Sequence, residues 1–559
     1  MPRADVSTTR THPARLSPKD EARPAATSTT PDVVVVDPAV AQLRQCLQQN
    51  GVKNFTRDHT TRDSLLYFSL QNLRFAEPSE LKPAVIVLPQ SAEEVQASLK
   101  CFLKARQDAK LVGKRPWELR IRSGGHSYEA RSSTAQSYFL IIDLMNMNKV
   151  VVDPVRSLSP PTAWVGGGAT LGEIYYAIAQ ATSNEYGFPA GICPTVGNGG
   201  HFSAGGYGFL ARKYGVAADN ILDAQIVTAD LQIKTSLLQD QDLLWALRGG
   251  GGGSWGIVIA WKIQLVRVTP VVTSYRVATT QQNTLANLMF QWQYLASTLA
   301  PDELEITVRL TSQGDGKILA EFSGQNLGTI NQTLAWFDEH FHDLGMQEGN
   351  CKEGNWIEAV ATTAHTQNRI DLTNRWFADK NYFKAKSDFV SKKISEEDWN
   401  VIIRAFVNKS VNLLGMLSYN RSMFFEPSGG FMWRVPSDKI AYPHRAGNLF
   451  SIQYLAAWSI DKSGHFEPDP DLYMAWIRDF YSRTMKPFVS HDNAEEARVA
   501  YVAFLDFDLG NSTSVSEASL TWGRSYFLQN FERLVQIKTR VDPKNVFNMP
   551  QSIPVARLS

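Results

Sequence analysis

The chain has 559 residues, of which 43% are hydrophobic and 20% are charged, and its formal net charge is +1. A charge this close to zero provides no broad positive field, which argues against partners such as nucleic acid or an anionic membrane surface. No stretch of about 18 apolar residues occurs, so the sequence also predicts no membrane-spanning helix.

The N-terminal segment, residues 1–38, is rich in Pro, Ser, Thr, Ala and Arg and is predicted to be disordered. Its only apolar run, "VVVV" at 33–36, is too short for the core of a signal peptide. Five Asn-x-Ser/Thr sequons nevertheless favour an extracellular or secretory-pathway protein; they begin at Asn54, Asn331, Asn408, Asn420 and Asn511.

The next part of the chain mixes short strands and helices. A helix over 91–107 is predicted by its apolar spacing and by Ser91 with Glu94, a capping-box pattern. Other predicted elements are a helix at 39–50, strands at 82–90, 117–125 and 137–147, a strand pair at 221–233, a helix at 240–250 and a strand at 255–266.

From about residue 271 longer strands dominate. The patterns predict strands at 275–280, 304–310, 317–324, 448–459 and 497–510, with an amphipathic helix at 329–343 and a final helix that ends in a Pro-containing loop. The fold class is therefore α+β. We expect a cofactor domain over 39–270, a substrate domain over 271–510, and a segment, 511–559, that returns to the cofactor domain.

Three glycine-rich loops, at 122–133, 197–208 and 248–256, indicate a ligand-binding site. Glycines allow backbone N–H groups to approach an anion, so three such loops indicate a large ligand with a pyrophosphate. Neither a Rossmann fingerprint nor a P-loop is present. Cys193 has no second cysteine at zinc-ligand spacing, so no metal site is predicted. Taken alone, His126 and Cys193 are more typical of structural residues.

The segments "IRSGGHSYE", "CPTVGNGGHFSAGGYG", "RGGGGGSWGIV" and "YPHRAGNLFSIQY" occur in an order that resembles the plant berberine bridge enzyme-like oxidases, which are vanillyl-alcohol-oxidase-type flavoproteins. The resemblance covers residues 40–555. It implies a two-part FAD-binding domain of the PCMH type, and a substrate domain whose large antiparallel sheet is backed by helices.

The same resemblance implies FAD attached twice, to its 8α-methyl by His126 and to C6 of its ring by Cys193. It also assigns neighbouring loop residues to the cofactor site: Ser123, Gly124, Gly125, Ser127, Thr195, Gly199, Gly200 and His201. Cys46 and Cys101 stand where the family has a disulfide, the alternative being two reduced thiols. Cys351 is left over.

For catalysis the resemblance points to Tyr128, Tyr207 and Gln453. At two positions the sequence departs from the family pattern, and these differences leave the identity of the catalytic base undetermined. Phe504 stands where many relatives have a proton-accepting tyrosine, and Ser451 where relatives that oxidise lignin alcohols have a lysine. The candidate bases are therefore Tyr207, Tyr128, or an acid such as Asp438 or Asp506.

Val196 occupies the family position above the flavin where oxygen approaches, and a small residue there implies an oxidase that produces hydrogen peroxide. We read His444 and Arg445 as a structural ionic anchor between domains. The leading hypothesis is a monomeric FAD-dependent oxidase of a carbohydrate hydroxyl, such as an anomeric one. The alternatives are oxidation of a monolignol or other phenylpropanoid alcohol, oxidation of an alkaloid, or a catalytically silent flavoprotein.

Overall fold

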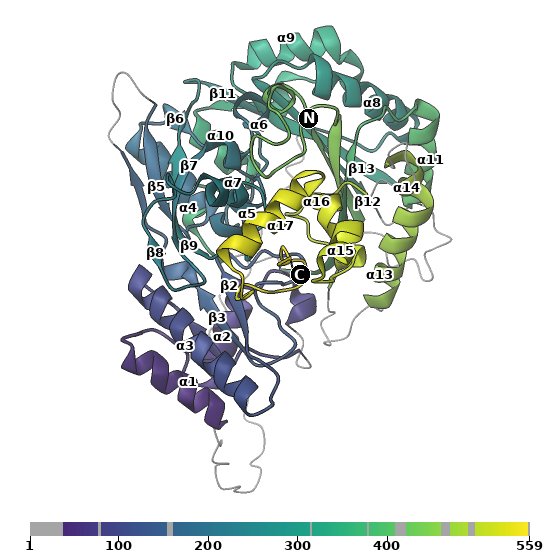
Figure 1. Ribbon diagram of the computed structural model, residues 1–559. Helices are drawn as coiled ribbons and strands as arrows, with labels where there is room; N and C mark the ends of the chain where they lie inside the picture. The colour runs from purple at the N-terminus through teal and green to yellow at the C-terminus, as the bar shows by residue number, and fades with distance from the viewer. Residues whose placement is uncertain are drawn as a thin grey trace, which may run out of the picture.

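The computed structural model describes residues 37–76, 80–153, 160–313, 316–376, 380–407, 421–459, 470–489 and 498–556 (Figure 1). Residues 1–36 of the predicted disordered segment and the sequons at Asn408 and Asn420 lie outside the described residues.

The N-terminal part is a small parallel sheet covered by helices. Its strands are ordered β1–β3–β2 and span Val85–Val87, Phe139–Asp143 and Glu118–Arg122. Helices α1 (Pro38–Gln49), α2 (His59–Ser69) and α3 (Ala92–Leu111) lie in the same region, at the lower left of Figure 1. The predicted start of α3 is correct, because the Ser91 hydroxyl accepts the backbone N–H of Glu94 at 3.3 Å.

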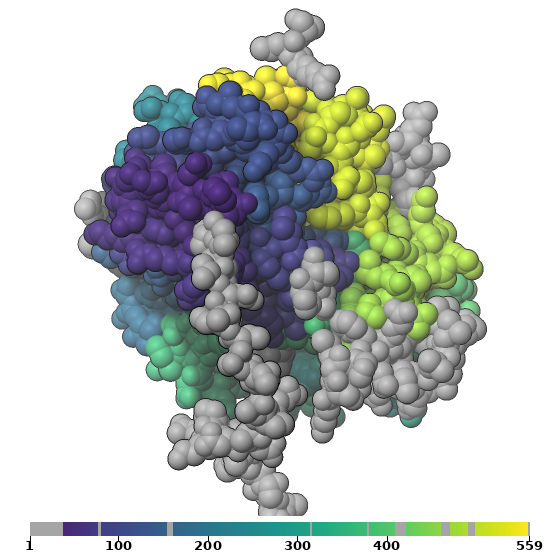
Figure 2. Space-filling model, turned by 90° about the horizontal axis from the view of Figure 1, so that it is seen from below, coloured from purple at the N-terminus to yellow at the C-terminus, as the bar shows by residue number. Residues whose placement is uncertain are grey.

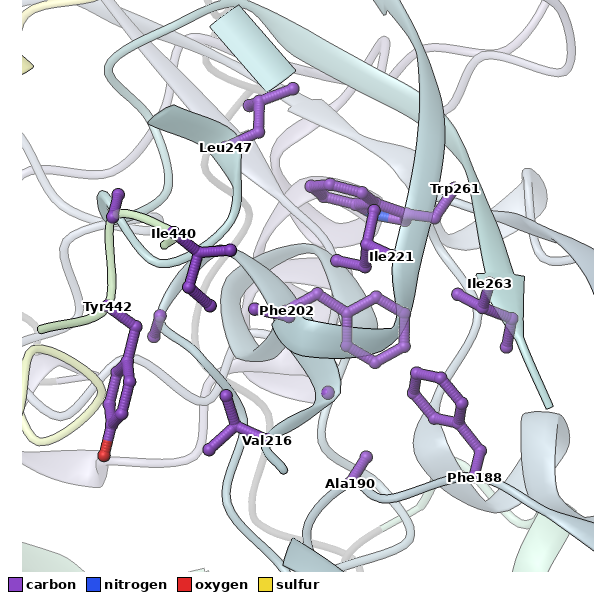
Figure 3. Close-up of a cluster of buried hydrophobic side chains, with 14 of the residues drawn as sticks. Phe188, Ala190, Phe202, Val216, Ile221, Leu247, Trp261, Ile263, Ile440 and Tyr442 are labelled. Carbon is purple, nitrogen blue, oxygen red and sulfur yellow. The ribbon is translucent and has the colours of Figure 1, made fainter. Parts of the chain in front are cut away.

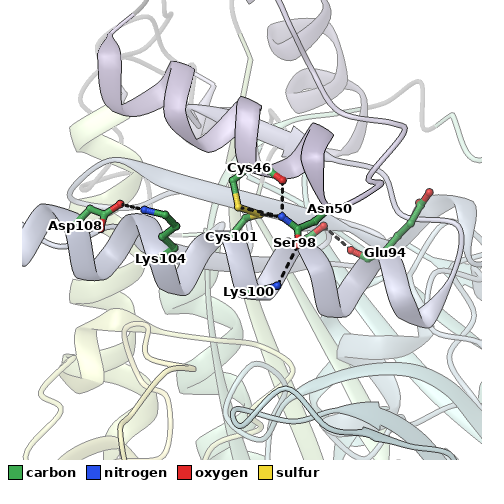
Figure 4. Close-up of a disulfide and its surroundings, with 8 residues drawn as sticks. All are labelled: Cys46, Asn50, Glu94, Ser98, Lys100, Cys101, Lys104 and Asp108. Carbon is green, nitrogen blue, oxygen red and sulfur yellow. Dashed lines mark hydrogen bonds and ion pairs between the residues drawn. A yellow bond between two sulfur atoms is a disulfide. The ribbon is translucent and has the colours of Figure 1, made fainter.

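The disulfide predicted between Cys46 and Cys101 is present (Figure 4). It joins α1 to α3, and the two Cα atoms are 5.7 Å apart. Cys193 and Cys351 are free cysteines. A disulfide is typical of proteins that fold in an oxidising compartment.

A second, antiparallel sheet completes the N-terminal half. Its order is β4–β5–β9–β7–β8, and the strands span Val150–Val152, Thr162–Gly166, Ile257–Gln264, Ile221–Val227 and Ile233–Lys234. Its main helices are α4 (Leu171–Ala181), α5 (Asn198–Ser203) and α7 (Gln241–Leu247). Phe202 of α5 packs between Phe188 and Trp261, with ring centroids 5.3 and 5.9 Å away (Figure 3). This core fixes the glycine loop that leads into α5.

The C-terminal half is built on a seven-stranded antiparallel sheet with the order β14–β11–β13–β12–β16–β17–β15. In that order the strands span Cys351–Gly354, Val272–Thr279, Ile318–Asn326, Leu304–Ser312, Arg421–Pro427, Phe450–Trp458 and Tyr382–Val390. The longer helices of this half are α8 (Gln282–Tyr294), α9 (Ile330–His340), α11 (Glu396–Val407) and α13 (Pro470–Asp479).

The two faces of this sheet differ because side chains alternate along each strand. On β12, Leu304, Ile306, Val308 and Leu310 are buried in a core shared with α8, α11 and α13, which lie on the outer rim in Figure 1. The intervening residues of β12 are Glu305, Thr307 and Arg309. The opposite face is therefore polar, and it points toward the N-terminal half.

The prediction of a strand over 497–510 is wrong. Residues 498–506 form no strand, and only a 3₁₀ turn, Phe507–Leu509, follows. The backbone N–H groups of this segment donate to groups that are not part of a β-sheet ladder. Ala500 donates to the Ser525 carbonyl, Tyr501 to the Ser387 hydroxyl and Asp506 to the Tyr526 hydroxyl, at 2.8–3.0 Å. The alternating apolar residues of this segment pack between the two halves of the protein and do not belong to a β-strand.

The C-terminal helix α17 (Asn530–Val541) lies against the N-terminal half. The Lys538 ammonium donates to the carbonyl of Ser254 at 2.8 Å, and the Arg533 guanidinium lies 4.0 Å from the ring centre of Trp245 on α7. The yellow C-terminal surface accordingly adjoins the blue N-terminal surface in Figure 2. The ionic anchor expected at His444 and Arg445 is confirmed for Arg445, whose guanidinium bonds Asp219 at 2.7 Å with both groups buried. The expectation is wrong for His444, because burial lowers its pKa to about 3 and its ring lies 3.1 Å from the Tyr526 carbonyl.

The remaining short elements connect these layers. They are β6 (Tyr186–Gly187), β10 (Val266–Arg267), α6 (Ala211–Tyr214), α10 (Trp356–Thr363), α12 (Phe431–Arg434), α14 (Lys486–Val489), α15 (Val515–Ala518) and α16 (Arg524–Phe527). None of the helices in the described ranges is long and apolar enough to cross a membrane.

Candidate active site

A cavity of about 830 Å³ lies between the glycine loops and the polar face of the seven-stranded sheet. The loops line one side of it, and β11, β12, β13, β16 and β17 line the other. A third wall comes from residues 501–505, the segment that connects the two halves.

The glycines shape the loop side of this cavity. A Cβ on Gly124 would lie 2.2 Å from the amide nitrogen of Gly197, so only glycine lets these two loops touch. Gly125 has φ +70°, which also favours glycine. A Cβ on Gly200 would meet no atom within 4 Å, and Gly252 has no closer neighbour than 3.7 Å. Both residues line the cavity, so a side chain there would occupy ligand space.

His126 and Cys193 meet in this cavity although 67 residues separate them. The His126 Nε2 is 3.0 Å from the hydroxyl of Thr195, and the Cys193 Sγ is 3.7 Å from the same hydroxyl. Burial lowers the pKa of His126 to about 3 and raises the pKa of Cys193. The imidazole is therefore neutral and the thiol protonated at neutral pH.

The other predicted loop residues support this pair. The Ser123 hydroxyl donates to the Gly167 carbonyl at 2.8 Å, and the Ser127 hydroxyl accepts the N–H of Arg131. His201 accepts the N–H of Gly191 at 2.9 Å, and burial lowers its pKa to about 4. Gly199 and Val196 line the same cavity.

Tyr128 and Gln453 also come together, as the sequence led us to expect. The Gln453 side-chain amide donates to the Tyr128 hydroxyl at 2.6 Å. Phe504 stacks on Tyr128 with centroids 5.3 Å apart and an interplanar angle of 13°. Burial raises the pKa of Tyr128 above its usual value of 10.0. Its phenol is therefore protonated at neutral pH and acts as a hydrogen-bonding group.

Tyr207 lines the cavity, but its hydroxyl already forms hydrogen bonds within the protein. It lies 2.6 Å from a carboxyl oxygen of Glu305 and 2.5 Å from the carbonyl of Pro427. A phenol has one proton, so it donates to Pro427 while a protonated Glu305 donates to it. Burial raises the pKa of Glu305 to about 8, which fits that protonation state, and it raises the pKa of Tyr207 well above its usual value.

Asp506 and Asp438, considered above as candidate bases, are not in the cavity lining. Asp506 is buried in an ion cluster with Lys384, Lys386 and Arg498, and these cations hold the pKa of its carboxyl far below the usual range. Asp438 is exposed on a loop. The predicted strand over 497–510 would have put Asp506 on the same face as Phe504, but no strand forms there.

Glu426 is a cavity carboxyl that the sequence reasoning missed. It lies on β16 opposite Ser451 of β17, whose hydroxyl donates to it at 3.1 Å. Burial raises the pKa of Glu426 from 4.5 to about 7. A usable signal was present in "FFEPSGG", where a charged residue interrupts an apolar strand beside a Pro-Ser-Gly-Gly turn. Among the described residues, no group of three or more His, Cys, Asp or Glu side chains could hold a metal ion.

Comparison with known proteins identifies relatives along nearly the whole chain. The profile of the family "Berberine and berberine like" matches residues 500–554, and that of an FAD binding domain matches residues 83–235. Berberine bridge enzyme-like D-1 of Nicotiana tabacum is 42% identical, over 92% of this chain and 91% of that protein.

Two solved structures are similar to this fold. A histidine-to-alanine variant of berberine bridge enzyme in complex with (S)-reticuline has a TM-score of 0.83 and 35% identity, and covers 92% of this chain and 99% of its own. A variant of Phl p 4 described as a glucose oxidase has a TM-score of 0.81 and 33% identity, and covers 92% and 100%.

Proposed function

Because the chain belongs to the berberine bridge enzyme-like family of FAD-dependent oxidases, with the PCMH-type FAD-binding fold, we propose that it oxidises a carbohydrate hydroxyl, such as the anomeric one. The observation that carries the proposal is the polar face of the seven-stranded sheet.

This polar face is suited to a ligand rich in hydroxyl groups. It presents hydroxyl and amide side chains from several strands to the cavity: Ser274, Thr307, Ser323 and Gln453. Each can donate and accept hydrogen bonds. The Ser274 hydroxyl is buried and has no hydrogen-bond partner among the described residues. An alkaloid or monolignol offers mainly aromatic surface and would leave this hydroxyl unsatisfied, which costs free energy. The similarity to a Phl p 4 variant described as a glucose oxidase agrees with this choice.

FAD fits the loop side of the cavity, where Gly200 and Gly252 leave space. The meeting of His126 and Cys193 at Thr195 supports covalent attachment through both, at the 8α-methyl and at C6, as the resemblance implies. Both attachment points lie on one edge of the isoalloxazine, so the attaching side chains must lie close together, as these do around Thr195. When bound, FAD supplies a hydride acceptor.

Glu426 is the group that we assign as the base. With a pKa near 7 it is ionised in a large fraction of molecules at neutral pH, whereas Tyr128 and Tyr207 keep their protons. A hemiacetal hydroxyl is more acidic than an ordinary alcohol, so a carboxylate of this basicity suffices. Tyr128, held by Gln453, orients the substrate hydroxyl. Tyr207 fixes the turn after β16 through Pro427.

The surroundings of the site lead to further assignments. Val196 lines the cavity, and its small side chain at the family position where oxygen approaches supports O₂ as the acceptor and hydrogen peroxide as the product. The disulfide and the sequons support a glycoprotein of the secretory pathway or the cell exterior. We propose that it acts as a monomer.

Two other enzymatic readings are weaker. Phenylpropanoid alcohol oxidation in relatives uses a tyrosine and lysine pair, and here Phe504 and Ser451 stand at those positions. Alkaloid ring closure uses a carboxylate where Gln453 stands. A silent flavoprotein would have no reason to retain both His126 and Cys193.

The test is anaerobic flavin reduction followed by absorbance, with peroxide measured after oxygen is admitted. Neutral di- and trisaccharides with free anomeric hydroxyls should reduce the flavin, while the same sugars as methyl glycosides should not. Reduction by coniferyl-type alcohols or by (S)-reticuline, with no sugar active, would reject the carbohydrate proposal.

A further inference from the structure

Arg309 is a cation of the cavity wall that the reaction proposed above does not use. It lies on β12, directly opposite Phe424 of β16, and its guanidinium carbon is 4.9 Å from the centre of the Phe424 ring. Arg309 is exposed to the cavity. Within the described ranges no carboxylate forms an ion pair with it.

The neighbouring carboxylate is already occupied. Glu321 of β13 is paired in register with Arg309, yet its carboxylate accepts two N–H bonds from Arg276, one of them at 2.6 Å. The three side chains therefore carry one uncompensated positive charge, and Lys352 adds another to the same cavity lining. Arg309 keeps its in-plane N–H donors available because the aromatic contact uses only the face of the guanidinium.

The position of Arg309 relative to Glu426 defines the ligand. Phe424 and Glu426 are two residues apart on β16, and Arg309 is one strand away. At about 3.4 Å per residue and 4.8 Å between strands, the Cα atoms of Arg309 and Glu426 are about 8 Å apart. A sugar ring at Glu426 would therefore place the second ring of a disaccharide near Arg309.

A negative group on the substrate is disfavoured beside Glu426. This carboxyl lines the cavity, and a further anion there would repel its ionised form. Elsewhere in the described part of the lining Arg309 and Lys352 are uncompensated cations. The cavity therefore offers a positive site one strand away from the carboxyl of the proposed reaction centre.

We propose that Arg309, supported by Phe424, binds a carboxylate on the second ring of the saccharide substrate, so that the preferred substrate is an oligosaccharide containing a uronic acid. This inference rests on the proposed oxidation of a sugar at Glu426. The planar fork of arginine matches a carboxylate with two parallel hydrogen bonds.

The test uses two disaccharides that differ in one group, cellobiose and its analogue with glucuronic acid as the non-reducing ring. Flavin reduction by each is measured across substrate concentrations in the holoenzyme. The acid should half-saturate the enzyme at a concentration about tenfold lower, as a charge-assisted pair contributes at least that factor. Arg309→Gln should abolish the difference, and Arg309→Lys should retain part of it. Arg524→Gln removes a matched exposed charge on α16, and this variant should retain the full difference between the two disaccharides.

A binding measurement separates this inference from the proposed reaction. The methyl glycosides of both disaccharides have no free anomeric hydroxyl, so their binding can be titrated calorimetrically without turnover. Tighter binding of the acidic glycoside, lost in Arg309→Gln, supports the subsite even if neither free sugar reduces the flavin. Equal affinity for the two glycosides, or an acid preference that survives Arg309→Gln, overturns it.

Discussion

Replacing Glu426 by glutamine should affect the rate and the stability of the protein in opposite directions. The substitution keeps the size and the hydrogen bond from Ser451 but removes the ionisable group. If Glu426 is the base, flavin reduction by a saccharide should slow by about 10²- to 10⁴-fold, the usual contribution of general-base catalysis. In the unaltered enzyme the rate should rise with pH through about 7, because the carboxylate is the active form.

The stability effect follows from the same pKa. Because folding raises the pKa of Glu426 from 4.5 to about 7, the folded protein binds this proton more tightly than the unfolded chain. That stabilisation is complete below pH 4.5 and is lost as the pH rises through 7. At about 1.4 kcal/mol per pKa unit, it corresponds to about 3 kcal/mol as an upper value, because water in the cavity screens part of the charge. Glutamine stays neutral, so the variant should be the more stable protein at pH 8.

The assay is stopped-flow flavin reduction at pH 5–9, alongside urea unfolding at pH 5 and pH 8. Glu305→Gln is a matched control, because Glu305 is also a buried carboxyl with a raised pKa, about 8, yet lies outside the cavity lining. It should gain stability at high pH and keep its reduction rate. A Glu426→Gln enzyme that reduces its flavin at the unaltered rate would refute the assignment.

Three further outcomes are expected. Unfolded, acid-precipitated protein should keep its yellow colour; His126→Ala should leave the flavin attached through Cys193, and the double change with Cys193→Ala should release it into the supernatant. Val196→Leu should slow reoxidation of the reduced flavin by oxygen while leaving its reduction by substrate intact, so equal reoxidation traces would exclude Val196 as the gate. Cys46→Ser opens a link between residues 55 apart and should destabilise the protein by about 4 kcal/mol on the chain-entropy relation, with an unchanged flavin spectrum. Free thiols at both positions in unreduced peptides would contradict the last expectation.

The sequence predicted most strands of both halves because alternation and turn residues are local signals. It also led to His126, Cys193 and the disulfide, since these stand in motifs resembling a known family. The segment at 498–506 was misread because its apolar residues satisfy contacts between distant parts, and its backbone bonds go to Ser387, Ser525 and Tyr526. No local pattern specifies such partners.

Glu426 was missed for a related reason. Its raised pKa results from burial, which the local sequence does not show, and its partner Ser451 lies 25 residues away on a neighbouring strand. The sequence had drawn attention to Ser451 as a missing lysine, but only the register of β16 and β17 shows which acid it contacts.

The connecting segment also determines when the cofactor can be attached. Residues 501–505 and Met549 form part of the cavity lining, although they lie near the C-terminal end of the chain. The ribosome must release these residues before the cavity has all its walls. We therefore expect FAD to bind only after these residues have been synthesised, and a chain that is truncated before residue 500 to be colourless.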